Sequence, residues 1–161
     1  MSQNLTNWGL VKASGGVAIV KFRALLVPTP KARARVTTRR VKGKVVAHAY
    51  TPKKTMDYEL SVRTAALRAM LGRPVLTGPV FARINCVMPV PASWPKAKKE
   101  RALSGQLWPT SKPDLDNLKK AVFDAMNGVV YVDDSQVVGD AGWKRYGEQP
   151  RVEVTIRGFD Q

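Results

Sequence analysis

Three stretches of the chain have the hydrophobic pattern of strands: one is continuously apolar and β-branched, and two alternate between apolar and other positions, which predicts one buried face. The first, 17–27, is β-branched and apolar and ends at Pro28. The alternation is strict over 80–88 and returns over 152–156. These segments are expected to form one sheet.

A helical period of apolar residues follows Thr55, which we expect to be the N-cap of a helix of about four turns. Gly72 followed by Pro74 is a stop signal. The residues at helical spacing, which predict the core-facing side, are Met56, Leu60, Leu67 and Met70.

A second helix is predicted over 114–126, ending at Asn127-Gly128. A short strand over 129–132, a turn over 133–135 and extended chain over 136–138 are expected next. The apolar face of this helix is formed by Leu115, Leu118, Val122 and Met126.

Between the first strand and the first helix, 31–54 is basic and rich in threonine. It predicts a hairpin that turns near Lys42-Gly43 and returns over 44–50. A basic excursion over 90–112 contains a short helix over 93–103. The expected fold is a single α+β domain over 17–161, with a mixed sheet and two main helices, preceded by a flexible lead over 1–16.

Composition removes several classes of protein. One cysteine and one histidine, Cys86 and His48, exclude an intrachain disulfide framework and a Cys/His zinc cluster. No apolar run approaches the roughly 18–20 residues of a membrane span, and residues 1–16 lack the layout of a signal peptide. A protein of the cytoplasm, without a membrane partner, is expected.

The net charge of +15 predicts a polyanionic partner, most simply nucleic acid. Residues 1–113 hold 21 basic and 3 acidic side chains, whereas residues 114–161 hold 6 basic and 9 acidic ones. We expect phosphate contacts from the basic segment, through Lys31, Arg33, Arg35, Arg39, Arg40, Lys42, Lys44 and Lys53. The basic residues over 96–101 are as easily explained by a solvated surface as by phosphate contact.

The acids of the second part are clustered, which phosphate binding alone does not explain. Pro113 favours an extended entry that places Asp114 at the N-cap, from which its carboxylate can turn back toward Asp116. Asp116, Lys120 and Asp124 then follow at a spacing of four along one helix face.

A second pair of acids, Asp133 and Asp134, follows the helix, and a unit of this length can return beside it, although the sequence does not fix the approach; if it does return, three or four carboxylates meet. A site made only of oxygen ligands suits Mg²⁺, with Mn²⁺ as a substitute, and a lysine beside it can supply positive charge at a phosphate. The sequence therefore predicts the chemistry of a metal-dependent nuclease.

Simpler interpretations exist for each residue. Asp114 alone reads as a helix cap, Asp133 and Asp134 as a turn, and Asp124 as a surface partner of Lys120. Asp140 is expected in a loop. His48 is expected to be structural and Cys86 to be a buried strand residue. Trp94, Trp108 and Trp143 are expected to pack or anchor loops, with stacking on unpaired bases as the alternative.

The block 112–138 closely resembles the RusA-like Holliday junction resolvases of phages and prophages, and 30–36 and 49–53 resemble that family's basic N-terminal segment. The resemblance implies a homodimeric, Mg²⁺-dependent endonuclease that cuts branched DNA, such as four-way junctions, by paired incisions. By position, Asp114, Asp116 and Asp134 match its metal-binding catalytic acids and Lys120 its catalytic lysine. Asp133 is a less certain ligand, and Asn117 and Asp124 are supporting residues.

Two rival functions remain open on the sequence. One is a basic nucleic-acid-binding protein without catalysis, in which the acids are caps and turns. The other keeps the nuclease chemistry and changes the substrate to forks, flaps or replication intermediates.

Overall fold

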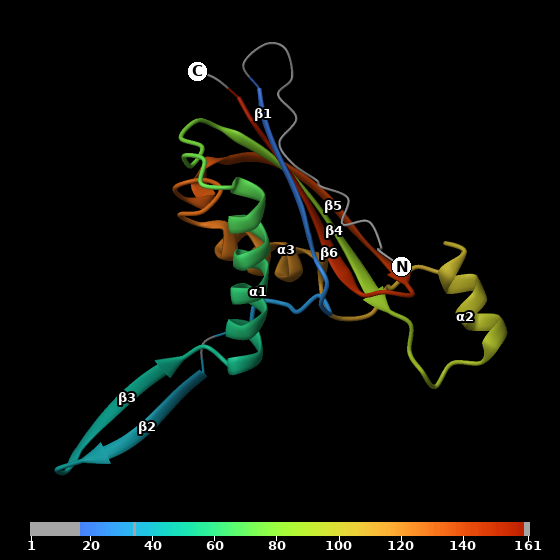
Figure 1. Ribbon diagram of the computed structural model, residues 1–161. Coiled ribbons are helices and arrows are strands. Elements are labelled where there is room, and N and C mark those ends of the chain that lie inside the picture. Colours follow the sequence, from blue (N-terminus) through green and yellow to red (C-terminus); the bar gives the residue numbers. More distant parts are fainter. Residues whose placement is uncertain (1–16, 34, 160–161) are drawn as a thin grey trace, which may run out of the picture.

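The computed structural model describes residues 17–33 and 35–159 (Figure 1). Four strands form the main sheet: β1 (Ala18–Ala24), β4 (Val80–Pro89), β5 (Val137–Gly147) and β6 (Arg151–Gly158). Their order is β1-β6-β4-β5. β6 runs antiparallel to both of its neighbours, whereas β4 and β5 are parallel, so the sheet is mixed. With the helices described next, this confirms the predicted α+β class.

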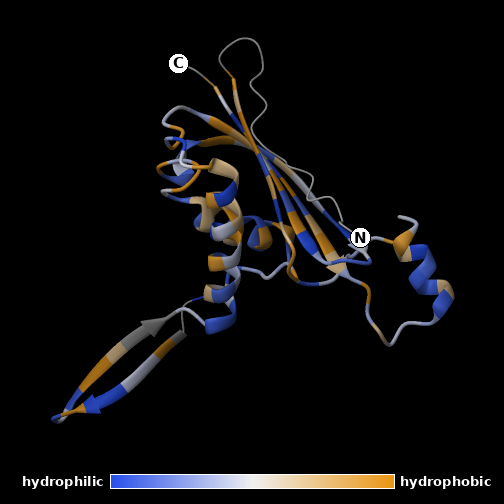
Figure 2. Cartoon of the chain, in the orientation of Figure 1, coloured by the Kyte–Doolittle hydropathy of each residue, from blue (hydrophilic) through white to orange (hydrophobic). Residues whose placement is uncertain are grey.

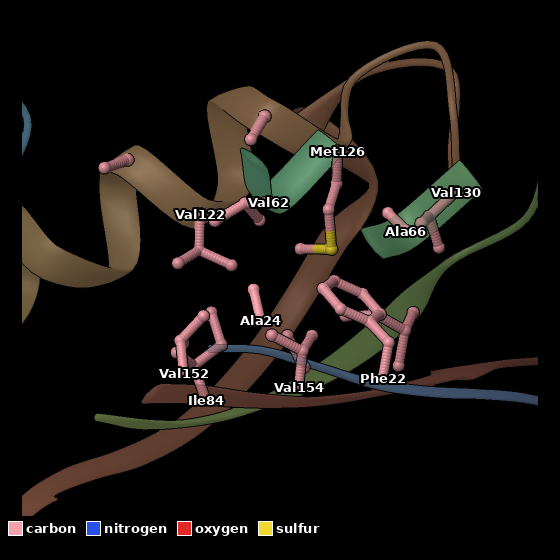
Figure 3. Close-up of a cluster of buried hydrophobic side chains, with 14 of the residues drawn as sticks. Phe22, Ala24, Val62, Ala66, Ile84, Val122, Met126, Val130, Val152 and Val154 are labelled. Carbon is pink, nitrogen blue, oxygen red and sulfur yellow. The ribbon is translucent and has the colours of Figure 1, made fainter. Parts of the chain in front are cut away.

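The core lies between one face of the sheet and two helices, α1 (Lys53–Met70) and α3 (Leu115–Met126). Figure 3 shows side chains of both helices, such as Val62 and Met126, above Phe22 and Val154 of the sheet. The alternation over 80–88 is confirmed, because every second residue of β4 is buried. Cys86 is among them, and burial raises the pKa of its thiol to about 12.

A separate two-stranded hairpin, β2 (Arg35–Val41) and β3 (Lys44–Tyr50), projects from the body of the protein (Figure 1). Its turn is at Lys42-Gly43, as predicted, and both residues have positive φ, 49° and 76°. Two consecutive residues of positive φ suit the twist of a two-residue hairpin turn, which is why glycine is placed there. The side chains of Arg35, His48, Ala49 and Tyr50 lie outside the described part of the structure.

The predicted basic excursion contains a short helix, α2 (Lys96–Leu103), at one end of the sheet (Figure 1). Trp94 holds this segment to β5, because its ring meets the Tyr146 ring edge-on with centroids 5.2 Å apart. The Lys98 ammonium lies 3.9 Å from the centroid of the same ring. Trp94 thus has the packing role expected of it, whereas Trp108 is exposed.

Thr55 does not cap α1, contrary to the sequence prediction. The helix begins at Lys53, its N-cap is Pro52, and the first helical bond runs from the Met56 N–H to the Pro52 carbonyl. Proline already has the φ that helix entry requires, so the chain turns into the helix earlier. The Thr55 side chain is buried in the first turn instead.

The predicted core face of α1 is also largely wrong. Met56, Leu60 and Leu67 are between 52% and 63% exposed, and only Met70 is buried as expected. The helix instead turns Tyr58, Val62 and Ala66 toward the sheet and α3. Periodicity locates an apolar stripe, but it does not say whether that stripe meets the chain's own core.

Residues 129–132 are not a strand. The Val129 and Val130 N–H groups both donate to the Met126 carbonyl, and Gly128 has a φ of 68°, so the chain turns tightly after α3. Only Tyr131 makes isolated bridges, to Leu76 and Asn127. These residues are apolar because they are buried against the end of α3, and their apolar run led to the wrong prediction of a strand.

The strand β5 is much longer than the predicted 136–138. Glycine has a low strand propensity, so the sequence pattern does not predict this strand. The close pairing of β5 with β4 nevertheless requires glycine. A Cβ on Gly142 would lie 2.4 Å from the Ile84 carbonyl oxygen of the neighbouring strand. The lead over 1–16 lies outside the described residues, and within the described ones no helix is long and apolar enough to cross a membrane.

Candidate active site

Asp114 occupies the N-cap of α3, as the sequence predicts, with extended φ and ψ of −70° and 145°. Its side chain makes no capping hydrogen bond. Asp116 is exposed in the first turn, where the helix dipole favours negative charge. Within 17–33 and 35–159, neither carboxylate has a side-chain hydrogen bond or ion pair, so both remain available to a ligand.

The peptide that leads into Asp114 is held by Lys144 of β5. The Lys144 ammonium donates to the carbonyl oxygens of Ser111 and Pro113, at 2.6 and 2.8 Å. Lys144 therefore fixes where α3 begins and where Asp114 projects. No role was predicted for Lys144, because a lysine late in a glycine-rich stretch gives no sign of which loop it will reach.

The two adjacent lysines of α3 have different surroundings. Lys119 forms an ion pair with Asp140, which lies in β5 and not in the loop expected for it. Lys120 is exposed, and no carboxylate of the described residues pairs with it. The residue that the resemblance marks as catalytic thus has a free ammonium group beside Asp116 on the same helix face.

Asp133 and Asp134 lie at the start of a single 3₁₀ turn, η1 (Asp134–Gln136). Asp133 caps it by accepting from the Ser135 N–H at 2.9 Å. The hydrogen bonds from the Ser135 side chain and then its backbone hold the pKa of Asp133 below its ordinary value. Asp134 has no side-chain hydrogen bond or ion pair to any described residue, so the two acids differ: one is used as a cap, and one is available.

Gln136 holds this acidic turn through both the oxygen and the nitrogen of its side-chain amide. Its Oε1 accepts from the N–H groups of Val132 and Asp133, at 2.8 and 3.1 Å. Its Nε2 donates to the carbonyls of Leu76 and Gly78, at 3.0 and 2.8 Å. No role was predicted for Gln136, although a glutamine three residues after an Asp cap is the pattern of a capping box.

Asp124 pairs with Lys31 and not with Lys120. The Lys31 ammonium lies 2.7 Å from Asp124 Oδ2 and 2.7 Å from Glu59 Oε1. Burial opposes the charge on Lys31, but its hydrogen bonds to Asp124 and Glu59 outweigh that effect and raise the pKa of Lys31. Lys31 was predicted to contact phosphate, and the structure instead gives it two carboxylate partners that link α1 to α3.

The remaining predicted cations lie apart from these carboxylates, mostly on the hairpin. Figure 2 shows hydrophilic positions near its tip. The exposed members with described side chains are Arg33, Arg39, Arg40, Lys42, Lys44 and Lys53. They are available for phosphate contact, whereas the side chain of Arg35 lies outside the described part.

The acids fall into two groups along α3. Asp114 and Asp116 lie at its N-terminal end. Asp124, Asp133 and Asp134 lie near Tyr131, whose hydroxyl donates to the Phe123 carbonyl in the C-terminal half of α3. Burial first, and then the charges of Asp134, Asp124 and Asp133, raise the pKa of Tyr131. The 12 residues of α3 span about 18 Å. Among the described residues, no three His, Cys, Asp or Glu side chains lie close enough to hold one metal ion.

A mixed-sheet α+β domain that combines unpaired carboxylates, an unpaired lysine and a projecting basic hairpin has the features expected of a DNA-cleaving enzyme. The sequence model of endodeoxyribonuclease RusA matches residues 26–157, and the chain belongs to the RusA endodeoxyribonuclease family. It is also similar to the uncharacterized protein YqaN of Bacillus subtilis (strain 168). The two are 43% identical over 142 residues, which cover 86% of this chain and 95% of that protein.

Proposed function

We propose that this protein is a Mg²⁺-dependent endonuclease that resolves four-way junctions or related branched DNA by paired hydrolysis of phosphodiester bonds. The observation that carries the proposal is the state of the acids that match the family's catalytic ones. Asp114, Asp116 and Asp134 make no side-chain hydrogen bond or ion pair with the described residues, although acids at helix starts usually act as caps.

The donor set suits Mg²⁺. This ion usually keeps several waters and binds through one or two carboxylates together with substrate phosphates, so a closed cage of three acids is not required. Asp114 and Asp116 would hold it. Asp134, the third acid that the resemblance marks as a ligand, lies in the other group of acids and forms no cluster of three with them among the described residues. Asp133 is the weaker candidate, because its carboxylate already holds Ser135. The bound ion would supply an activated water and offset the charge that develops on the phosphate.

The chain's own residues bind and orient the DNA. The Lys120 ammonium is free to donate to a phosphate oxygen beside Asp116. The exposed cations of the hairpin neutralise backbone phosphates and carry DNA toward a site whose acids would otherwise repel it. Lys144 and Gln136 keep the two groups of acids in place through the bonds described above.

The test is Asp116→Asn, assayed on a synthetic four-way junction in Mg²⁺ and in EDTA. Loss of the carboxylate should reduce cleavage by a factor of about 10³ or more, because metal binding and charge stabilisation both depend on it. Junction binding in EDTA should be unchanged or tighter, since a repelling charge is removed. Asp57→Asn is the matched control, because Asp57 is exposed on α1 and its side chain has no described partner.

Wild-type cutting by Asp116→Asn in Mg²⁺ would contradict the assignment. A fork, a flap and a linear duplex in the same assay separate junction resolution from cleavage of other branches. Equal cutting of the linear duplex would contradict structure selectivity while leaving the nuclease chemistry intact.

We also propose that the active form is a homodimer, because paired incisions need two sites. Met56, Leu60 and Leu67 are exposed on α1 within about 40° of arc, and the exposed Leu71 follows as the left-handed C-cap of the helix. If two copies of α1 cross antiparallel about an axis between residues 63 and 64, Leu60 faces Leu67 of the second copy and Met56 faces its Leu71. Such a stripe is self-complementary, as a two-fold interface requires.

One observation favours the rival function, a nucleic-acid-binding protein without catalysis. The described residues contain no ready-made cluster of three metal ligands. That protein would bind the junction equally in Mg²⁺ and EDTA and would never nick it, so the assay above separates the two functions.

A further inference from the structure

The face of the sheet that points away from α1 and α3 is strongly basic. Figure 1 shows both helices on one side of the sheet, and no described helix covers the middle of the other side. Because side chains alternate along a strand, the residues between the buried ones point outward. The cations among them are Lys21 and Arg23 of β1, Arg83 of β4, Arg145 of β5, and Arg151 and Arg157 of β6.

Among the described strand residues that point to this side, Glu153 is the one acid, and it is already paired. Glu153 Oε1 lies 2.8 Å from Arg151 Nε and 3.7 Å from an Arg145 guanidinium nitrogen. Arg23 and Arg83 have no carboxylate partner among the described residues. Arg23 and Arg83 therefore have no acid among the described residues to neutralise them, and an anion from outside would do so.

The face also carries an aromatic ring. Trp143 of β5 is 38% exposed, and the Arg83 guanidinium lies 5.7 Å from its ring centroid. The strand register places Trp143 beside Asn85, which is itself beside Glu153. An exposed tryptophan next to an arginine guanidinium offers a base a surface for stacking beside a phosphate contact.

A cavity of about 240 Å³ lies in the middle of this face. Its polar lining comes from Lys21, Arg23, Arg83, Asn85, Glu153 and Thr155. Asn85 Oδ1 is buried without a hydrogen-bond partner among the described residues, so the wall contains an acceptor that is not satisfied. Cations and an amide around a small hollow suit a nucleotide better than a featureless polyanion.

We propose that this open face binds single-stranded DNA, with Arg23 and Arg83 on its phosphates and Trp143 on an unpaired base. A duplex would hide its bases from Trp143, whereas a single strand exposes them. The site is on the opposite side of the sheet from the acids of α3, so it holds a strand that is not being cut. That the nucleic acid is DNA rests on the proposed function.

The experiment measures binding of a fluorescent oligothymidylate of about 20 nucleotides, and of a duplex of equal length, to the full chain in EDTA. Arg23→Gln with Arg83→Gln should weaken single-strand binding about tenfold and lower its slope of log K against log[salt] by about 1.4. Arg68→Gln with Arg73→Gln is the control, since both are exposed at the end of α1 and remove the same charge. Trp143→Leu should weaken single-strand binding about tenfold, and Trp143→Phe should restore most of it.

Equal weakening by the control pair would overturn the proposal, because net charge alone would then explain the loss. It would also be overturned if the duplex lost as much affinity as the single strand, or if phosphatidylglycerol vesicles displaced the oligonucleotide from the wild type but not from the Arg23/Arg83 variant. The catalytic proposal is tested separately. A wild-type protein that never nicks the junction in Mg²⁺ refutes the nuclease proposal, whereas the result for this face depends only on single-strand binding in EDTA.

Discussion

Asp114 and Asp133 occupy the same kind of position, the N-cap of a helix, but only Asp133 caps. From the sequence, both are an acid before a helical turn, and capping is the simplest role for either. The structure separates them through their partners: Ser135 donates to Asp133, and no described N–H or side chain donates to the Asp114 carboxylate. An acid at a cap position that does not cap indicates a role outside the fold.

Lys31 shows the reverse, a residue whose sequence context predicts binding and whose structure gives it a role in stability. It follows two prolines in a basic segment, so phosphate contact is the natural interpretation of the sequence. Its partners, Glu59 and Asp124, are 28 and 93 positions away along the chain. No local pattern could show them.

We expect Lys31→Met to lower the free energy of unfolding by about 1–2 kcal/mol, because two partly buried carboxylates lose their cation. Urea denaturation measures this, with Lys53→Met, which removes an exposed lysine, as the control. In the double variant with Asp124→Asn the two losses should be less than additive. Additive losses, or none, would contradict the link between α1 and α3.

The pH dependence of this stabilisation has a defined sign. The pKa of Lys31 is raised above its ordinary value of 10.5 in the folded protein. Its contribution is therefore complete below that value and is lost as the pH rises through the raised pKa. The difference between wild type and Lys31→Met should accordingly be constant from neutrality up to about pH 10.5 and shrink only at higher pH.

At the scale of elements, the sequence predicts the turn and the strands of the hairpin β2–β3 well. It does not predict that this hairpin stands apart from the main sheet. Its turn and both strands agree with the expectation. Yet it forms a sheet of its own, and Val36 and Val45 are each 63% exposed. An isolated two-stranded hairpin is marginally stable in water, so we infer that this one is used against a partner.

If the hairpin is the arm that grips duplex DNA, its cations set the salt dependence of binding. Arg39→Ala with Arg40→Ala should lower the slope of log K against log[salt] by about 1.8 for a junction with duplex arms. Fluorescence anisotropy between low and moderate salt measures the slope. Arg68→Ala with Arg73→Ala serves as the control, and an unchanged slope in the hairpin variant would remove it from the interface.

At the scale of the whole molecule, the uneven charge acquires a spatial meaning. The basic side chains are distributed over the hairpin, α2 and the open sheet face, whereas the unpaired acids lie along α3 and in the turn after it. A phosphate backbone is attracted to the surroundings and repelled at the acids unless a cation is bound there. This arrangement suits an enzyme that needs a metal ion to cut.

The exposed stripe of α1 gives the dimer a testable form. Leu60→Glu should convert the protein to a monomer at micromolar concentration, because each two-fold interface contains that residue twice and a buried, unpaired charge is costly. Sedimentation velocity measures the mass. Leu25→Glu, at a residue 58% exposed on another part of the surface, should leave the dimer intact. A monomeric wild type, or a dimeric Leu60→Glu, would contradict this interface.

The sequence by itself determined most of the element types, the hairpin turn, the second helix with its N-cap and the acids that match the family, because periodicity, turn chemistry and spacing are local. Only the tertiary structure decided which side of α1 faces the core, that residues 129–132 turn instead of pairing, and that a long glycine-containing strand follows. It also decided which charged residues are already paired. The reason is physical: a side chain's partner is set by how distant segments pack, and neither the pairing of Lys31 nor the hold of Lys144 on the peptide before Asp114 is written in its neighbours along the chain.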